Sequence, residues 1–467
     1  MSGPTSPPLF HQLREQHTLL VYHSHEVRVE KSTVVMAWKF ELTPGIFFNP
    51  EMTFIFPEKM TSAGMDQGSL EHLAFHIGMI ELISYYKAAC PAEIIIRPYA
   101  LPTDAITFWK HIYFLGLGEF RYLNHIQEDL DALFSIINKG APLPDLNGQV
   151  DAGRLMVPVG GGKDSAVSLW LLSRYHKDYE LIPFMVNPWP ASWRTLDALG
   201  FSRQDALTVN RKLDPKLLEL NSKGYLNGHT PFSALLAFTA HAAAMMCKAG
   251  HITLSNESSA SEATIPGTEI NHQYSKSIDF EQRFRNYLKQ ISRSQVNYFS
   301  LLRPLNELQI AAIFSRMTAV HPVFRSCNAG SKTDSWCGKC PKCLFTAVML
   351  APYLDDGPLL QIFGKDILSD SSLQAYLDEL GGWAETKPFE CIGTVDEVRQ
   401  ALSMARKKRN FNNLPFLLDY AGRWLNESEG KDTAHYLKIF DHQHFVPAEF
   451  MERLQDVMCQ SIPGVKR

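Results

Sequence analysis

The stretch RLMVPVGGGKDSAVSLWLLS, residues 154–173, predicts a strand, a glycine turn and a helix in immediate succession. The apolar run 155–159 is expected to form a buried strand, and residues 166–173 a helix. Between them, three consecutive glycines allow the backbone to approach a ligand without an intervening Cβ atom. Backbone N–H groups and a helix N-terminus then face one point, an arrangement that binds anions. A phosphate-binding turn is therefore predicted; a tight turn without a ligand is the alternative.

The glycine run does not match a Walker A loop. That loop requires G-x-x-x-x-G-K-[ST], whereas Gly162 and Lys163 are followed here by Asp164, and Val157 stands where the first glycine belongs. The run resembles the S-G-G-x-D-S loop of the PP-loop ATP pyrophosphatases, with Gly160 in place of the usual serine. This resemblance implies cleavage of ATP to AMP and pyrophosphate, commonly by adenylylation of a substrate oxygen.

The composition limits the class of protein. A chain of 467 residues is long enough for two or three domains, and 45% hydrophobic with 20% charged residues is typical of a soluble globular protein. No apolar stretch reaches the roughly 18 residues that span a bilayer, and the N-terminal sequence lacks the features of a signal peptide. We therefore expect a cytoplasmic protein with no membrane partner. A net charge of -4 argues against a nucleic-acid partner.

The first part of the chain, residues 1–145, is expected to form an α+β domain. Valines, aromatic residues and rough alternation over residues 20–56 favour antiparallel strands, and residues 69–89 have the spacing of an amphipathic helix. His72 and His76 lie four apart on that helix. A metal site is one interpretation, but a partly buried helix face is favoured, because no carboxylate-rich partner segment is evident.

Residues 146–352 alternate between expected strands and helices, which predicts an ATP-binding catalytic domain with a parallel sheet. Ligands of such sheets lie beyond the carboxyl ends of the strands. Asn187 and the run 255–257 follow expected strands and are site candidates by position alone. The expected strands are 155–159, 181–186, 206–209, 252–254 and 298–302, and the main expected helices are 233–248 and 307–317.

Residues 353–467 are expected to be mostly helical, with segments such as TVDEVRQALSMARKKR. The fold class predicted for the whole chain is therefore α/β. It combines a parallel-sheet core of the PP-loop, adenine nucleotide α-hydrolase-like type with an α+β N-terminal domain and a mostly helical C-terminal part.

A long polar stretch, residues 255–281, separates two regular elements. Loops of this length inside a compact domain are usually functional. The stretch carries carboxylates, a histidine and a lysine, which are the groups needed to move a proton and to bind acidic substrate groups. A solvated loop without chemistry is the alternative, and the spacing does not identify the base. The candidates for catalysis here are Glu257, Glu262, His272, Tyr274 and Lys276.

Four of the eight cysteines form a compact pattern, Cys327-x9-Cys337-x2-Cys340-x2-Cys343. Four thiolates with two C-x2-C steps suit a tetrahedral zinc ion. Because four protein ligands leave no open position, the zinc would be structural. Unligated buried thiols or an iron–sulfur cluster are the alternatives. The other cysteines are interpreted as core residues: Cys90, Cys247, Cys391 and Cys459.

Several segments together resemble the UDP-N-acetylmuramoyl-L-alanyl-L-glutamate epimerases of bacterial peptidoglycan synthesis. The resemblance is carried by AFHIGMIELISYYKA, EIIIRPY and FWKHIYFLGLGEF, and further on by VPVGGGKDS, INHQYSKSIDFE and SCNAGSKTDSWCGKCPKC. It implies that ATP and Mg²⁺ drive conversion of the terminal L-glutamate of the UDP-muramoyl dipeptide to D-glutamate, with release of AMP and pyrophosphate. Adenylylation would remove the charge of the carboxylate and make the α-proton easier to abstract.

The loop and this resemblance together imply roles for the candidate residues. Lys163 and Asp164 are catalytic candidates, the first neutralising phosphate charge and the second helping to position Mg²⁺. The N-terminal domain would bind the UDP-muramoyl portion through aromatic residues such as Trp38 and Tyr85, although a core role is favoured for each alone. The residues expected at the nucleotide are Gly160, Gly161, Gly162, Lys163, Asp164, Ser165 and Asn187. The residues expected at the substrate are Asn256, Arg325 and Lys332.

Two rival functions share parts of this pattern. A PP-loop enzyme that modifies a nucleoside or tRNA, similar to 7-cyano-7-deazaguanine synthase, would have the same loop and a similar cysteine site. Such a tRNA enzyme should carry a basic accessory domain with exposed aromatic residues, and residues 1–145 are not obviously basic. A non-catalytic ATP-sensing regulator is the second rival, and the intact Lys-Asp-Ser run argues against it.

Overall fold

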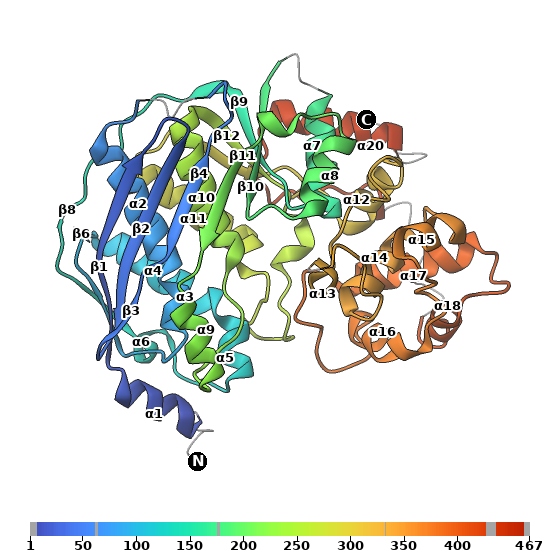
Figure 1. Cartoon of the computed structure of the whole chain (residues 1–467). Coiled ribbons are helices and arrows are strands. Elements are labelled where there is room, and N and C mark those ends of the chain that lie inside the picture. Colours follow the sequence, from blue (N-terminus) through green and yellow to red (C-terminus); the bar gives the residue numbers. More distant parts are fainter. Residues whose placement is uncertain (1–6, 61–63, 175–177, 332, 426–435, 462–467) are drawn as a thin grey trace.

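The computed structural model describes residues 7–60, 64–174, 178–331, 333–425 and 436–461. Its centre is a mixed sheet of eleven strands in the order β13-β12-β9-β10-β11-β4-β2-β1-β5-β7, with β3 paired to β2. Helices pack against this sheet, and a group of further helices forms a second lobe beside it (Figure 1). The α/β class predicted from the sequence is confirmed.

The middle of the chain supplies five parallel strands in the order β13-β12-β9-β10-β11. β9 lies between β10 and β12, so the strand order reverses beside it, and ligands bind at such a switch point. All five predicted strands are present, although β9 begins earlier than expected. Their bounds are β9 (Asp151–Pro158), β10 (Glu180–Val186), β11 (Leu207–Lys212), β12 (Ala249–Leu254) and β13 (Asn297–Ser300).

The N-terminal strands extend the same sheet. β2 pairs antiparallel with β1 and with β4, as the alternating pattern predicted. β4 also pairs antiparallel with β11, a pairing that the sequence did not indicate. The N-terminal and middle parts of the chain therefore share one continuous sheet across the boundary predicted near residue 145. These strands are β1 (Leu19–Val29), β2 (Thr33–Leu42), β3 (Ile46–Phe48), β4 (Glu51–Ile55), β5 (Glu93–Ile96) and β7 (Ser135–Asn138); a separate pair is β6 (Tyr99–Ala100) and β8 (Ala141–Pro142).

The parallel part of the sheet is buried on both faces. Along β9, Met156 belongs to one hydrophobic core, whereas Leu155 and Val157 belong to another, because successive side chains point to opposite faces. The first core lies beneath helices of residues 67–290. The second lies beneath the helices of residues 163–173 and 307–314 and the C-terminal helices. Helices of the first face include α2 (Gln67–Glu81), α3 (Ile83–Tyr86), α4 (Thr103–Gly116), α10 (Phe232–Cys247) and α11 (Ile278–Gln290).

The second lobe consists of helices in its described residues, as predicted for the C-terminal part. Its helix α17 begins with a capping box between Thr394 and Glu397, and α12 begins with one between Asn306 and Gln309. None of the described helices of the whole chain is long and apolar enough to cross a membrane. The helices on this side are α7 (Lys163–Ser173), α12 (Glu307–Phe314), α13 (Asn328–Ser331), α14 (Pro341–Leu350), α15 (Asp356–Phe363), α16 (Gln374–Leu380), α17 (Val395–Lys408), α18 (Phe416–Ala421) and α20 (Ala448–Ser461).

Two expectations about the N-terminal residues change with the fold. Trp38 and Tyr85 are buried, and the Trp38 indole N–H donates to the Ala74 carbonyl, so neither aromatic side chain is available to a substrate. His72 and His76 are buried on α2, in agreement with the favoured helix-face interpretation. The remaining short helices are α1 (Pro8–Gln16), α5 (Gly118–Leu123), α6 (Leu130–Leu133), α8 (Pro190–Ala198) and α9 (Pro215–Ser222).

Candidate active site

The glycine turn lies between the carboxyl end of β9 and the first residue of α7, as predicted. Gly161 has φ +82°, and a Cβ atom there would lie 2.6 Å from the backbone nitrogen of Ser192. Gly160 differs, because a Cβ atom at that position would meet nothing within 4 Å. The Arg325 N–H donates to the Gly161 carbonyl at 2.9 Å and fixes the turn from the other side. The turn therefore requires glycine at position 161 but not at position 160.

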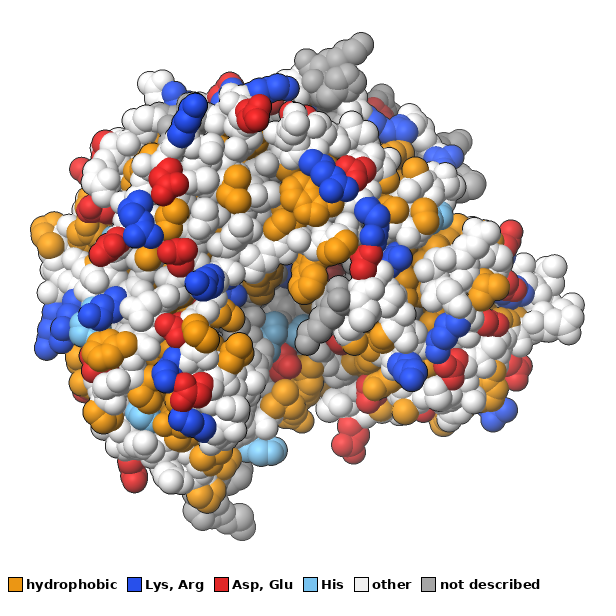
Figure 2. All heavy atoms as spheres, viewed as in Figure 1, with side chains coloured by type: hydrophobic (Ala, Val, Ile, Leu, Met, Phe, Trp, Pro, Cys, Tyr) orange, Lys and Arg blue, Asp and Glu red, His pale blue; other side chains and the backbone are white. Residues whose placement is uncertain are grey.

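A cavity of about 540 Å³ opens at this turn. The molecular surface has a hollow between the part that contains the sheet and the C-terminal lobe (Figure 2). The cavity is lined by residues from the turn, the polar stretch, the cysteine segment and the loop before α17. The predicted site residues that line it are Gly160, Gly162, Asp164, Ser165, Asn256, His272, Lys276, Arg325 and Cys327.

Lys163 is not among the residues that line this cavity. Its side chain is 4% exposed, and its Nζ forms ion pairs with Asp164 and with Glu307, the latter at 2.8 Å. Burial lowers the pKa of Lys163, but the two carboxylates outweigh burial and hold the pKa above its usual range. The lysine therefore balances buried negative charge beneath the turn.

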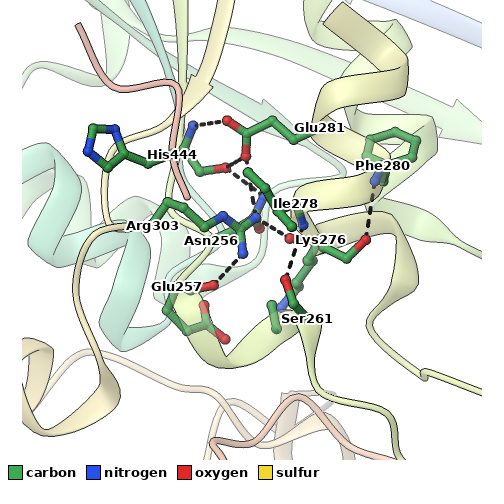
Figure 3. Close-up of polar contacts among 12 residues, drawn as sticks. Asn256, Glu257, Ser261, Lys276, Ile278, Phe280, Glu281, Arg303 and His444 are labelled. Atoms are coloured by element: carbon green, nitrogen blue, oxygen red, sulfur yellow. Dashed lines mark hydrogen bonds and ion pairs between the residues drawn. The ribbon is translucent and has the colours of Figure 1, made fainter. Parts of the chain in front are cut away.

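Arg303 holds the polar stretch in place (Figure 3). Its guanidinium, only 1% exposed, donates to the backbone carbonyls of Glu257 and Lys276 and forms an ion pair with Glu281 at 3.3 Å. Glu281 also accepts from the Ser300 hydroxyl at 2.7 Å, so the arginine is tied to the end of β13. The two ends of the stretch are thereby joined beneath the cavity.

Other predicted residues lie outside the cavity lining. The Tyr274 hydroxyl donates to Asp279 at 2.9 Å. The Asn187 amide joins β10 to β11 by donating to the Arg211 carbonyl at 3.0 Å and accepting from its N–H at 2.7 Å. Gly161 and Glu257 are not among the lining residues, and Glu262 pairs with Lys387. Lys332 is outside the described residues.

His272 belongs to a polar cluster that the sequence did not reveal as a unit. Its Nδ1 hydrogen-bonds the Glu119 carboxylate from α5, and the ring of His229 lies 4.4 Å away between centroids. Burial lowers the pKa of His272, but hydrogen bonds to Cys391 and Glu119 outweigh it and raise the pKa to about 9. The imidazole therefore carries a positive charge at neutral pH.

Cys391 lines the cavity, so its interpretation as a core residue was wrong. It belongs to the loop between α16 and α17 and lies near Lys276, Lys342 and His272. No local pattern indicates this position, because the neighbours come from segments 50 to 120 residues away in the sequence. The other three cysteines outside the cluster do not line the cavity; of these, Cys90 and Cys247 are fully buried.

The four clustered cysteines come together as predicted. Sγ–Sγ distances are 3.6 Å for Cys327 and Cys340, 3.7 Å for Cys337 and Cys343, and 3.5 Å for Cys340 and Cys343. A tetrahedral ion with bonds of about 2.3 Å to sulfur would separate its ligands by about 3.8 Å. Backbone N–H groups of Gly330 and Lys339 also point at two of the sulfurs. The arrangement can hold a metal ion.

Comparison with known proteins now gives a family. The model of the MurL N-terminal domain matches residues 12–301, and the model of the MurL C-terminal domain matches residues 323–435. The chain belongs to the MurL family. The match at residues 323–435 extends well beyond the segments that carried the resemblance in the sequence, and it includes the four cysteines and Cys391.

Similar proteins carry one name, UDP-N-acetyl-alpha-D-muramoyl-L-alanyl-L-glutamate epimerase. The protein from Salinispora tropica is 37% identical over 340 residues, 71% of this chain and 73% of the relative. The protein from Xanthomonas oryzae pv. oryzae is 35% identical over 388 residues, 81% of this chain and 84% of the relative. In this MurL-family chain, the cavity lies between the segments matched by the two domain models, since both contribute lining residues.

Proposed function

We propose that the chain catalyses ATP-dependent epimerisation of the terminal L-glutamate of UDP-N-acetylmuramoyl-L-alanyl-L-glutamate to D-glutamate, for peptidoglycan precursor synthesis. The printed names of the relatives support the substrate and the stereochemical outcome. One observation carries the mechanism: a single cavity joins a glycine turn at a helix N-terminus to a cluster of titratable side chains. ATP is available in the cytoplasm, so we assign the reaction to that compartment.

The turn fits the phosphates of a nucleoside triphosphate. Gly160 and Gly162 line the cavity, and α7, which starts at Lys163, has its N-terminal N–H groups at the same turn. Ser165 and Asp164 line the cavity beside them. Ser165 would donate to phosphate and Asp164 would hold Mg²⁺, which prefers carboxylate oxygen and phosphate ligands. These features support a PP-loop role for the parallel sheet.

The substrate carboxylate would react first at this turn. An oxygen of the glutamate α-carboxylate attacks the α-phosphorus of ATP, a P–O bond breaks, and pyrophosphate leaves. The product is an acyl adenylate in which the carboxylate charge is gone, so the adjacent C–H bond is more acidic. A base removes the α-proton, a proton returns on the opposite face, and water then releases AMP and the D-glutamyl product.

Positive and aromatic side chains of the cavity suit such a substrate. Arg325, Lys276 and Lys342 all line it and can approach carboxylates or phosphates, and Asn256 can donate to them. Trp189 and Phe232 are 47% and 46% exposed at the same cavity and offer flat surfaces for nucleotide bases. The four-cysteine cluster would hold structural Zn²⁺ and so brace the wall that contains Cys327.

The test mixes protein, ATP and Mg²⁺ with the UDP-muramoyl dipeptide and measures AMP and pyrophosphate. The proposal predicts that AMP forms only when the L-glutamate dipeptide is present, and that Asp164→Asn abolishes it. AMP formation driven by tRNA or a deazapurine, with none from the dipeptide, would instead identify a nucleoside-modifying enzyme. Binding of ATP without turnover under every condition would identify a sensing protein.

A further inference from the structure

Cys391 is held rigidly at the cavity. The side-chain amide of Gln273 donates to the carbonyl of Ile392 at 3.0 Å, and the Lys342 ammonium donates to the carbonyl of Cys391 itself. On the other side, the Asn328 amide donates to the Glu390 carboxylate at 3.0 Å. The polar stretch and α14 therefore both hold the backbone from which this thiol projects, and the cysteine segment holds the neighbouring Glu390 side chain.

The thiol is surrounded by cations. His272, Lys276 and Lys342 line the same cavity as the thiol, and the positive charge of each favours its ionised form. Burial raises the pKa of Cys391, but these three groups outweigh burial and lower the pKa well below its usual value. The adjacent acid in the same loop, Glu390, has its pKa raised by burial. A thiolate is the expected form at neutral pH.

The same cations connect the thiol to the glycine turn. Lys276 and Lys342 both lower the pKa of Asp164, the turn residue that lines the cavity, although its immediate partner Lys163 has a larger effect and burial opposes both. Lys276 is itself positioned by Arg303, which binds its carbonyl oxygen (Figure 3). A substrate carboxylate activated at the turn would therefore lie within the same electrostatic environment as Cys391.

We propose that the Cys391 thiolate is the group that exchanges the α-proton of the activated glutamyl residue. This inference rests on the proposed function. The C–H bond breaks, its electron pair stays on Cα as the enolate, and the proton forms an S–H bond on Cys391. A water molecule then donates a proton to Cα from the opposite face, and the hydroxide that it leaves takes the proton of the Cys391 thiol through solvent, which restores the thiolate.

His272, Lys276 and Lys342 are positioning residues in this scheme. Their charges keep the sulfur ionised before the reaction, and the Glu119 carboxylate keeps His272 in its charged form. Because the thiolate would be used as a base and not as a nucleophile, no acyl–sulfur bond forms at any step.

The test separates activation of the substrate from proton exchange. In deuterated water, Cys391→Ala should retain dipeptide-dependent pyrophosphate release within about tenfold, while deuterium entry at the glutamate α-carbon falls about 10²–10⁴-fold. Cys459→Ala, which changes a thiol outside the cavity lining, should leave both measurements unchanged. Full deuterium entry in Cys391→Ala, or a glutamyl thioester on Cys391 found by mass spectrometry of acid-quenched wild-type protein, would overturn the proposal.

A second measurement uses the folded wild-type protein without turnover. Cys391 should react with iodoacetamide faster than the isolated Cys459 at pH 7, and Lys276→Met should slow that reaction at least about tenfold, since the thiolate is the reactive form. Slow alkylation of Cys391 in both proteins would contradict the inference. If wild-type protein releases no pyrophosphate with the dipeptide, the proposed function fails instead, and the alkylation result still reports on the thiolate.

Discussion

The Nζ atom of Lys163 lies 2.8 Å from Oε2 of Glu307, and both side chains are almost completely buried beneath the glycine turn. The sequence led us to expect this lysine at a phosphate group. In the structure it instead neutralises carboxylates inside the protein, and it supports the turn from below. The first residue of α7 is thus tied to the first residue of α12, and the turn rests on a fixed base.

This ion pair predicts a large loss of stability in Lys163→Met. Removal of the lysine leaves the buried Glu307 carboxylate without its counter-charge, which typically costs about 3–5 kcal/mol. Lys216→Met removes a lysine that pairs with Glu219 on the surface, where such pairs contribute about 0–1 kcal/mol. Urea unfolding should separate the two variants clearly. Equal unfolding free energies would show that the Lys163 pair does not support the fold.

Substitution by alanine is predicted to have opposite effects on activity at Gly160 and at Gly161. Gly161→Ala introduces a Cβ atom 2.6 Å from the Ser192 nitrogen at a positive φ, so the turn must shift and dipeptide-dependent AMP formation should fall at least about 10²-fold. Gly160→Ala meets open space and should retain most of the activity. The rates of AMP formation by the two purified, folded variants test this. Similar rates would mean that the turn does not hold the reacting phosphates.

His272 predicts a pH-dependent contribution to stability. Its pKa is about 9 in the folded protein, against a usual value of 6.5, so the folded state binds the proton more tightly. The resulting stabilisation is complete below pH 6.5 and is lost as the pH rises through 9. The difference in unfolding free energy between wild type and His272→Gln should therefore shrink between pH 6.5 and 9. A difference that stays constant or grows over this range would contradict the assigned charge.

The cysteine cluster predicts bound zinc. Purified protein should contain about one zinc ion per chain, and Cys340→Ser should lower both the zinc content and the thermal unfolding temperature, since structural zinc stabilises folding directly. Cys90→Ser alters a buried cysteine outside the cluster and should keep the zinc. Metal analysis decides between these outcomes. Iron with sulfide would identify the iron–sulfur alternative. Absence of metal from protein that was expressed in medium containing zinc would contradict the zinc site.

Local patterns predicted the strands, the glycine turn and the cysteine cluster because each depends on residues close together in sequence. The pairing of β4 with β11 was not predicted, since it joins segments about 150 residues apart. The orientation of the Lys163 side chain depends on its ion pair with Glu307, which lies 144 residues away in the sequence.

The residues proposed for proton transfer show the same limit. His272 and Lys276 were candidates because they lie in an unusually polar stretch. Cys391 has no such local sign, and only the docking of the loop before α17 against that stretch brings its thiol to the cavity. Glu119 was likewise not singled out, because its partner His272 lies 153 residues away in sequence.

The central claim is that one cavity activates a carboxylate and then inverts the neighbouring carbon. The most direct measurement incubates the protein with ATP, Mg²⁺ and UDP-N-acetylmuramoyl-L-alanyl-L-glutamate in deuterated water and analyses the glutamate by chiral chromatography and mass spectrometry. We predict D-glutamate that carries one α-deuterium, formed only with ATP and accompanied by AMP. AMP release with L-glutamate that has gained no deuterium would contradict the account.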